Sequence, residues 1–258
     1  MDAHDAQQAA MAIETTASGD QQAARARLVD LFRSSPLPTE DLLFNLGLYT
    51  RSSLLVKFLV LSEIYERFMH VPGLICEFGT WWGQNLVLLE NLRAIHEPFN
   101  KQRRIVGFDT FEGYTPAGQR DKKSDVWQEH SYSTGTGWMD QLRALLRTHE
   151  QSNVLGNISD VHELVQGDVA LTAPAWFAAR PESIVAFAYF DMGLYEPTRA
   201  SMEAIRPHLV PGSCILLDEL TWSESPGEAI AFKEVFGRAG YRLERLAKYP
   251  SKALVTIL

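Results

Sequence analysis

Short apolar runs alternate with longer amphipathic segments through most of this chain, starting after Pro72-Gly73. The apolar runs predict strands at residues 74–78, 104–108, 161–166, 184–190 and 213–217. Helical periodicity predicts helices at residues 82–96, 138–149, 174–179, 197–208 and 227–239, and residues 241–247 and 253–258 can form a closing pair of strands. Strands and helices that alternate at this spacing predict an α/β fold with a mostly parallel sheet covered on both faces.

The residues before this region show a different pattern. Residues 1–20 are rich in Ala, Gln and Thr with little periodicity, which indicates a mobile arm. Helical patterns follow at residues 21–33 and 52–68, and Thr39 is expected to cap a short helix between them. We therefore expect an arm at 1–20, a helical extension at 21–70 and the α/β domain at 71–258.

Composition narrows the classes of function. The 258 residues are 46% hydrophobic and 22% charged, as in an ordinary globular protein, and the net charge of −8 argues against nucleic-acid binding. The run Leu54–Leu61 is interrupted by Lys57 and is too short to cross a bilayer, and the N-terminus lacks the layout of a signal peptide. Cys76 and Cys214 lie within predicted strands and are expected to be buried free thiols, which indicates a protein of the reducing cytoplasm.

A glycine turn follows the first predicted strand. Glu77 and Gly79 end this strand, and Asp109 directly follows the apolar run of the next one, where an acid can accept the hydroxyls of a ribose. Gly79 and Gly83 are four residues apart with Trp81 between them, so the G-x-G-x-x-G loop that binds a pyrophosphate is absent. This spacing favours S-adenosylmethionine, with Trp81 as a wall of its site, over a dinucleotide. The alternative is a strand-to-helix turn whose glycines serve packing alone.

Three acids follow two later predicted strands. Asp191 comes after one apolar run, and Asp218 with Glu219 after the next. If these strands are neighbours, their carboxyl ends lie about 5 Å apart, and a hard divalent cation such as Mg²⁺ would offset the repulsion between the carboxylates. The ion would assist deprotonation of a substrate hydroxyl, and Asp191 could take the proton. The alternative for Glu219 is a helix N-cap, whereas Asp191 precedes its helix by too many residues to cap it.

Two further features are open to a ligand or a structural interpretation. Asp168 follows a predicted strand and could accept a hydrogen bond from an adenine amine, although an Asp after Gly is also common in turns. The long loop 110–137 contains Tyr114, Tyr132 and several glycines. It can be a flap over a polar ligand such as a sugar, or an insertion whose aromatic side chains pack onto the domain.

Four segments together resemble the macrocin O-methyltransferase family, metal-dependent sugar methyltransferases of antibiotic pathways. They are Glu77-Phe78-Gly79-Thr80, Gly107-Phe108-Asp109-Thr110-Phe111-Glu112-Gly113, Asp191-Met192-Gly193-Leu194-Tyr195-Glu196-Pro197-Thr198 and Leu217-Asp218-Glu219. The resemblance implies a class I S-adenosylmethionine-dependent methyltransferase fold, Rossmann-like, with a seven-stranded sheet. By this likeness Asp191, Asp218 and Glu219 are the metal ligands and Asp191 is also the base, although relatives often have an aspartate in place of Glu219.

The resemblance also implies the cofactor contacts. The methionine part would lie against Glu77, Gly79 and Thr80, the ribose on Asp109, the adenosine beside Thr110 and Phe111, and the adenine near Asp168.

The amino-acid sequences of these segments are most similar to those of enzymes that methylate the 3-hydroxyl of a 6-deoxyhexose, such as TDP-rhamnose. Such enzymes are commonly homo-oligomers. Three alternatives remain at this stage: a methyltransferase for a phenolic or glycosylated aglycone, an NAD-dependent oxidoreductase, and a non-catalytic assembly module.

Overall fold

Seven strands make one sheet in the computed structural model, which describes residues 17–121, 129–153 and 160–258. The strands are β1 (Leu74–Phe78), β2 (Ile105–Asp109), β3 (Glu163–Gln166), β4 (Val185–Phe190), β5 (Leu209–Leu217), β6 (Tyr241–Arg245) and β7 (Ala253–Ile257). Their order in the sheet is β3-β2-β1-β4-β5-β7-β6, and β7 runs in the direction opposite to the other six strands. The predicted mostly parallel sheet with a closing pair of strands is confirmed.

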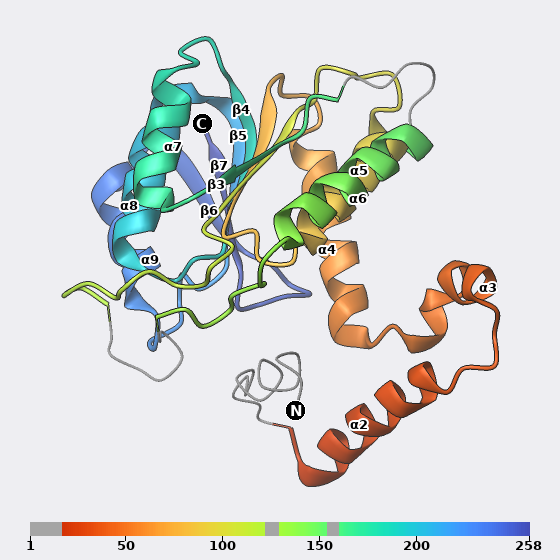
Figure 1. The fold of residues 1–258 in the computed structure, drawn as a ribbon. Coiled ribbons are helices and arrows are strands. Elements are labelled where there is room, and N and C mark those ends of the chain that lie inside the picture. Colours follow the sequence, from red (N-terminus) through yellow and green to blue (C-terminus); the bar gives the residue numbers. More distant parts are fainter. Residues whose placement is uncertain (1–16, 122–128, 154–159) are drawn as a thin grey trace. The chain divides into compact units, whose positions relative to one another are not determined.

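Helices cover both faces of this sheet. The helices of the described residues are α2 (Gly19–Arg33), α3 (Thr39–Phe44), α4 (Ser52–Phe68), α5 (Gln84–His96), α6 (Trp138–Asn153), α7 (Val169–Ala178), α8 (Tyr195–Ile205) and α9 (Pro226–Phe236), with the 3₁₀ turns η1 (Leu46–Tyr49) and η3 (Arg206–His208). Helices α7, α8 and α9 pack side by side on one face, and α5 and α6 pack together on the other (Figure 1). This is the class I methyltransferase architecture that the sequence predicted.

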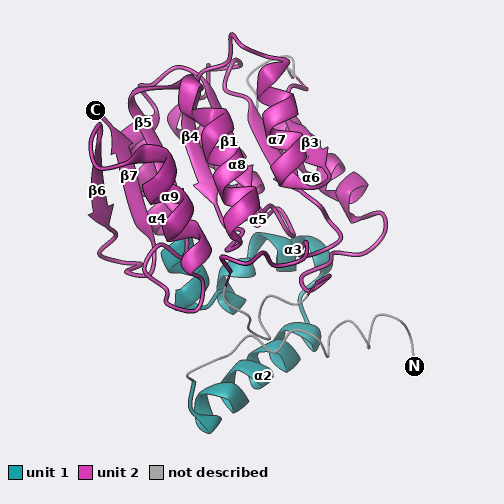
Figure 2. Ribbon diagram, turned by 90° about the vertical axis from the view of Figure 1, so that its left-hand side faces the viewer, with its two compact units in different colours: residues 1–58 teal, residues 59–258 magenta. Residues whose placement is uncertain are grey.

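The chain divides into two compact units, residues 1–58 and 59–258, and the division falls within α4 (Figure 2). In the first unit, the capping box of Ser18 and Gln21 begins α2, and the rings of Phe32 and Tyr49 meet edge to face with centroids 5.2 Å apart. The second unit holds the whole sheet. Residues 1–16 of the expected arm lie outside the described residues. No helix among the described residues has both the length and the apolar character that crossing a membrane requires.

A row of aromatic side chains lies just inside the carboxyl edge of the sheet. The ring of Phe78 stacks on Phe108 and on Phe190, with centroids 5.0 and 4.7 Å away. All three side chains are buried in the main core. Because successive residues of a strand point to opposite faces, Asp109 and Asp191, the next residues, turn away from this core at the edge of the sheet.

The start of α7 and the cap of α3 differ from the prediction. Helix α7 begins at Val169, five residues before Pro174, because the side chain of Asp168 accepts a hydrogen bond from Ala170 N and caps it. Pro174 therefore lies inside the helix. The predicted side-chain cap of α3 is wrong: Pro38 is the N-cap residue and makes no side-chain hydrogen bond.

Candidate active site

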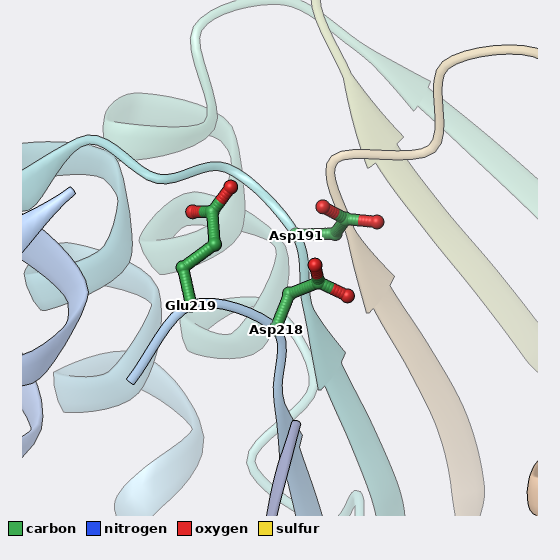
Figure 3. A group of neighbouring side chains, drawn as sticks. All are labelled: Asp191, Asp218 and Glu219. Atoms are coloured by element: carbon green, nitrogen blue, oxygen red, sulfur yellow. The ribbon is translucent and has the colours of Figure 1, made fainter. Parts of the chain in front are cut away.

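The three acids predicted at the strand ends come together. Strands β4 and β5 are parallel neighbours with Phe190 opposite Leu217, so Asp191 and Asp218 leave the sheet side by side. One carboxylate oxygen from each of Asp191, Asp218 and Glu219 lies within 4.8 Å of the others (Figure 3). This geometry matches the predicted cluster, and all of its ligand atoms are carboxylate oxygens.

Burial and the nearby negative charge of Asp191 both oppose ionisation of Glu219 in this cluster. Burial, followed by the charge of Asp191, raises the pKa of Glu219 to about 8. The fully buried Glu228 lies behind it and accepts a hydrogen bond from Glu219 N at 2.9 Å. Three oxygen ligands in a partly buried, electron-rich site fit a hard cation such as Mg²⁺ or Mn²⁺. The residues present therefore suit the metal that the sequence suggested.

Asp218 differs from the other two acids because it already has a cationic partner. The ammonium of Lys252 forms an ion pair with Asp218 Oδ1, and the hydroxyl of Tyr189 donates to the same oxygen. Lys252 Nζ also donates to the hydroxyl of Tyr189 at 2.9 Å. The sequence analysis missed both residues, since neither follows the carboxyl end of a strand.

The glycine turn between β1 and α5 places a second set of polar groups beside the acids. Glu77 is fully buried, and its Oε1 accepts a hydrogen bond from Asn85 Nδ2 at 2.6 Å. A Cβ atom added to Gly79, whose φ is +90°, would lie 2.2 Å from the carbonyl oxygen of Asp191. The turn thus passes directly over the residue after β4, and close packing of the backbone already requires glycine here.

Asp109 holds the conformation of this turn. Its Oδ2 accepts from Trp81 N at 2.7 Å and its Oδ1 accepts from Phe111 N at 2.6 Å. Burial raises the pKa of Asp109, and these backbone donors oppose the shift. Trp81 and Phe111 both have positive φ values, 49° and 58°. Such strain in non-glycine residues is concentrated at functional sites. Here the two strained residues follow the ends of β1 and β2, and Asp109 binds both of their backbone N–H groups.

Two of the remaining candidates for the cofactor site, Asp168 and Thr110, have local structural partners. Asp168 caps α7, as described above, and the hydroxyl of Thr110 donates to Gly113 O at 2.6 Å. The buried hydroxyl of Thr80 has no hydrogen-bond partner among the described residues. A contact of these three residues with a cofactor remains a prediction.

Aromatic residues from both described ends of the long loop 110–137 gather above the turn. The ring of Tyr132 meets Trp81 and Tyr114 edge to face, with centroids 5.5 and 5.4 Å away. Burial, together with the charges of Asp191 and Glu219, raises the pKa of both tyrosines. The aromatic part of the loop therefore lies close to the acid cluster. Trp127 lies outside the described residues.

Comparisons with known proteins identify the family of the chain. Residues 76–220 match the model of a family described as "Methyltransferase domain". The structure is similar to that of CalS11, a calicheamicin methyltransferase, with 37% identity, 94% of each chain covered and a TM-score of 0.89. An apo structure described as CalS11, TDP-rhamnose 3'-O-methyltransferase, matches with 36% identity, a TM-score of 0.81, and coverage of 94% of this chain and 96% of that one.

A curated relative is more distant. It is the 8-demethyl-8-(2,3-dimethoxy-alpha-L-rhamnosyl)-tetracenomycin-C 4'-O-methyltransferase of Streptomyces olivaceus, 26% identical over 152 residues. The match covers 58% of this chain and spans only about half, 53%, of the length of that relative. The O-methyltransferase NovP is similar in fold, with 17% identity, a TM-score of 0.60, and coverage of 78% of this chain and 79% of that one.

Proposed function

The chain belongs to the methyltransferase domain family, and from this premise we propose that it transfers the methyl group of S-adenosylmethionine to the 3-hydroxyl of a nucleotide-linked 6-deoxyhexose such as TDP-rhamnose. The observation that carries the proposal is the acid cluster of Asp191, Asp218 and Glu219 beside the turn that Asp109 organises. The 37% identity to CalS11 over 94% of both chains supports the sugar acceptor and a role in antibiotic biosynthesis.

Two acceptors are chemically close. The CalS11 relative is described as acting on TDP-rhamnose, and the curated relative is described as acting on a rhamnosyl group of a tetracenomycin. The nucleotide-linked sugar is favoured here because the CalS11 match has both higher identity and nearly full coverage of either chain.

We assign each residue of the candidate site either to cofactor binding or to methyl transfer. We assign Asp109 to the ribose and Asp168 to the adenine, with Glu77, Gly79 and Thr80 along the methionine part of the cofactor and Trp81, Thr110 and Phe111 as its walls. The acceptor oxygen attacks the sulfonium methyl in line, the C–S bond breaks, and S-adenosylhomocysteine leaves with the electron pair. We assign the proton of the hydroxyl to Asp191, whose carboxylate lies with those of Asp218 and Glu219 and whose backbone packs against the glycine turn at Gly79.

A divalent cation, in our proposal Mg²⁺, would be held by Asp191, Asp218 and Glu219, and when bound it lowers the pKa of a nearby hydroxyl. The three oxygens within 4.8 Å of one another support this assignment. The raised pKa of Glu219 supports it further, since positive charge in the cluster would relieve the repulsion between the acids.

The variant Asp191→Asn tests the role of the base. It keeps the size of the side chain but removes its capacity to accept a proton, so methyl transfer should fall by about 100-fold or more. Transfer is measured by mass spectrometry with TDP-rhamnose as acceptor, in parallel with a rhamnosylated aglycone. The affinity for S-adenosylhomocysteine, measured by calorimetry, should stay near the wild-type value because Asp191 belongs to the acceptor side.

The matched control is Glu196→Gln. Glu196 lies at the start of α8, only five residues along the chain, but it is exposed and pairs with Arg199. This variant should keep wild-type activity. Wild-type transfer by Asp191→Asn would refute the assigned role, and methylation of the glycosylated aglycone in place of TDP-rhamnose would change the proposed acceptor.

A further inference from the structure

Lys252 reaches the acid cluster because of the direction of its strand. The parallel strands present their carboxyl ends at the catalytic edge, but β7 is antiparallel to β5 and presents its amino end there. In this register Leu217 lies opposite Ala253. The residue after Leu217 is Asp218 and the residue before Ala253 is Lys252, so the topology places the two side by side.

The surroundings of Lys252 are those of a fixed internal cation. Its side chain is only 5% exposed, and its Nζ lies 4.6 Å from the ring centroid of Tyr249. Taking an ammonium out of water costs several kcal/mol unless the charge is paired and hydrogen-bonded. The pair with Asp218 Oδ1 and the hydrogen bond to Tyr189 supply this compensation. Lys252 is therefore held in one place.

The consequence for Asp218 concerns its two oxygens. Oδ1 is engaged by both Lys252 and Tyr189, and from this we infer that Oδ2 is the oxygen that Asp218 offers to a cation. Tyr189 stands two residues before Asp191 on β4, so the same hydroxyl lies on the face of the sheet from which Asp191 extends. Carboxylates that bind metals are commonly oriented by partners of this kind, and loss of such a partner typically weakens metal binding.

We propose that Lys252 is a positioning residue: together with Tyr189 it fixes the Asp218 carboxylate so that one oxygen faces a divalent cation. The proposal rests on the function proposed above. The alternative is that the positive charge of Lys252 competes with the metal ion for the carboxylates. Because the three ligand atoms are already within 4.8 Å while Lys252 is in place, the geometry favours orientation over competition.

The test measures binding of Mn²⁺ alone to the purified full chain by calorimetry. Lys252→Met keeps a long apolar stem in the buried position and removes the charge, and it should bind Mn²⁺ about 10- to 100-fold more weakly than wild type. Affinity for S-adenosylhomocysteine should not change, which separates loss of orientation from a general loss of structure. The control Lys248→Met removes an ammonium four residues away that is 55% exposed and pairs with Glu63, and it should bind Mn²⁺ like wild type.

A second variant covers the case in which Lys252→Met does not fold. Tyr189→Phe keeps the buried ring and removes only the hydroxyl that contacts Asp218, and it should weaken Mn²⁺ binding several-fold. Equal or tighter binding by a folded Lys252→Met, or by Tyr189→Phe if only that variant folds, overturns the inference while the proposed metal site stands. A wild-type chain that binds no Mn²⁺ overturns both.

Discussion

At the scale of single residues, the least expected group is Glu228, a carboxyl with no contact with solvent. Its pKa is raised well above the ordinary value of 4.5, chiefly by burial and then by the charge of Glu219. Its Oε1 accepts a hydrogen bond from Glu219 N, and the hydroxyl of Ser225 donates to Glu219 Oε2 at 3.2 Å. A neutral Glu228 can thus hold the backbone of Glu219 without adding a further charge to the cluster.

This state of Glu228 predicts how stability depends on pH. The folded chain keeps a proton on Glu228 that the unfolded chain loses above about pH 4.5, so the free energy of unfolding should fall as pH rises beyond that value. The contribution of one proton is about 1.4 kcal/mol per pH unit. Glu228→Gln is neutral in both states and should lose this part of the slope. Urea unfolding in chelator at pH 5, 6 and 7 measures it.

The control for this prediction is Glu182→Gln, which changes an exposed acid between α7 and β4 and should retain the wild-type slope. If Glu228→Gln and the wild type lose stability in parallel between pH 5 and pH 7, Glu228 is not held neutral in the folded chain.

The acids of the site are the residues that the sequence predicts best. Asp109, Asp191 and Asp218 each follow an apolar run, and that pattern marks the carboxyl end of a strand. Lys252 and Glu228 could not be predicted in this way, because neither directly follows an apolar run. Lys252 precedes an apolar run, and it matters only because β7 is antiparallel, while Glu228 lies in the first turn of a helix and is buried by tertiary packing.

At the scale of elements, the junction between β1 and α5 fixes the distance between the two halves of the site. Gly79 packs its backbone against the residue after β4, and Asp191 N donates to Phe78 O at 2.9 Å. The sequence allowed two interpretations of Gly79, either close approach of a ligand or packing of the chain. The structure shows that packing alone already requires glycine at this position. The same close packing that demands glycine also brings the turn after β1 next to Asp191.

Gly79→Ala tests this packing requirement. The new Cβ would stand 2.2 Å from a carbonyl oxygen, so the backbone must move in addition to bearing the cost of a positive φ. We expect destabilisation of about 3 kcal/mol or more, together with weaker binding of S-adenosylhomocysteine. Urea unfolding and calorimetry measure the two effects.

Gly240→Ala is the matched control for that experiment. Gly240 has a φ of +88°, almost equal to the +90° of Gly79, but a Cβ there has no heavy atom within 4 Å. It should cost only the conformational strain, about 1–2 kcal/mol, and leave cofactor binding intact. Equal losses in the two variants would show that contact with Asp191 adds nothing.

Element boundaries were predictable where periodicity alone decides them. The limits of α4 and β1 agree with the sequence pattern. Helix α5 starts at Gln84, two residues later than predicted, because Gly83 takes a left-handed conformation as its N-cap. Helix α7 extends past its proline toward the cap at Asp168. In both helices a local backbone conformation overrides the hydrophobic pattern.

At the scale of the whole molecule, the strand order explains why the site lies where it does. Strand β1 lies between β2 and β4, so the connections leave it in opposite directions, and in open α/β sheets ligands bind at the carboxyl ends of the strands at such a point. The glycine turn after β1 and the acids at the carboxyl ends of β2, β4 and β5 all lie at this point of the sheet. Alternation of elements predicts a parallel sheet but not this order of its strands, which the structure supplies.

The helical unit at residues 1–58 leads to a prediction about assembly. In α3, Leu43 and Phe44 are 70% and 90% exposed, and neither α2 nor α3 has a buried residue. Large apolar side chains left in water favour association, and the resemblance to the macrocin family implies a homo-oligomer. Light scattering of the wild type should therefore give a multiple of 29.0 kDa, and Leu43→Ser/Phe44→Ser should lower it. Leu171→Ser on α7, also at a 70% exposed leucine, should not. A wild-type monomer, or an unchanged mass for the double variant, would exclude this surface as the contact between copies.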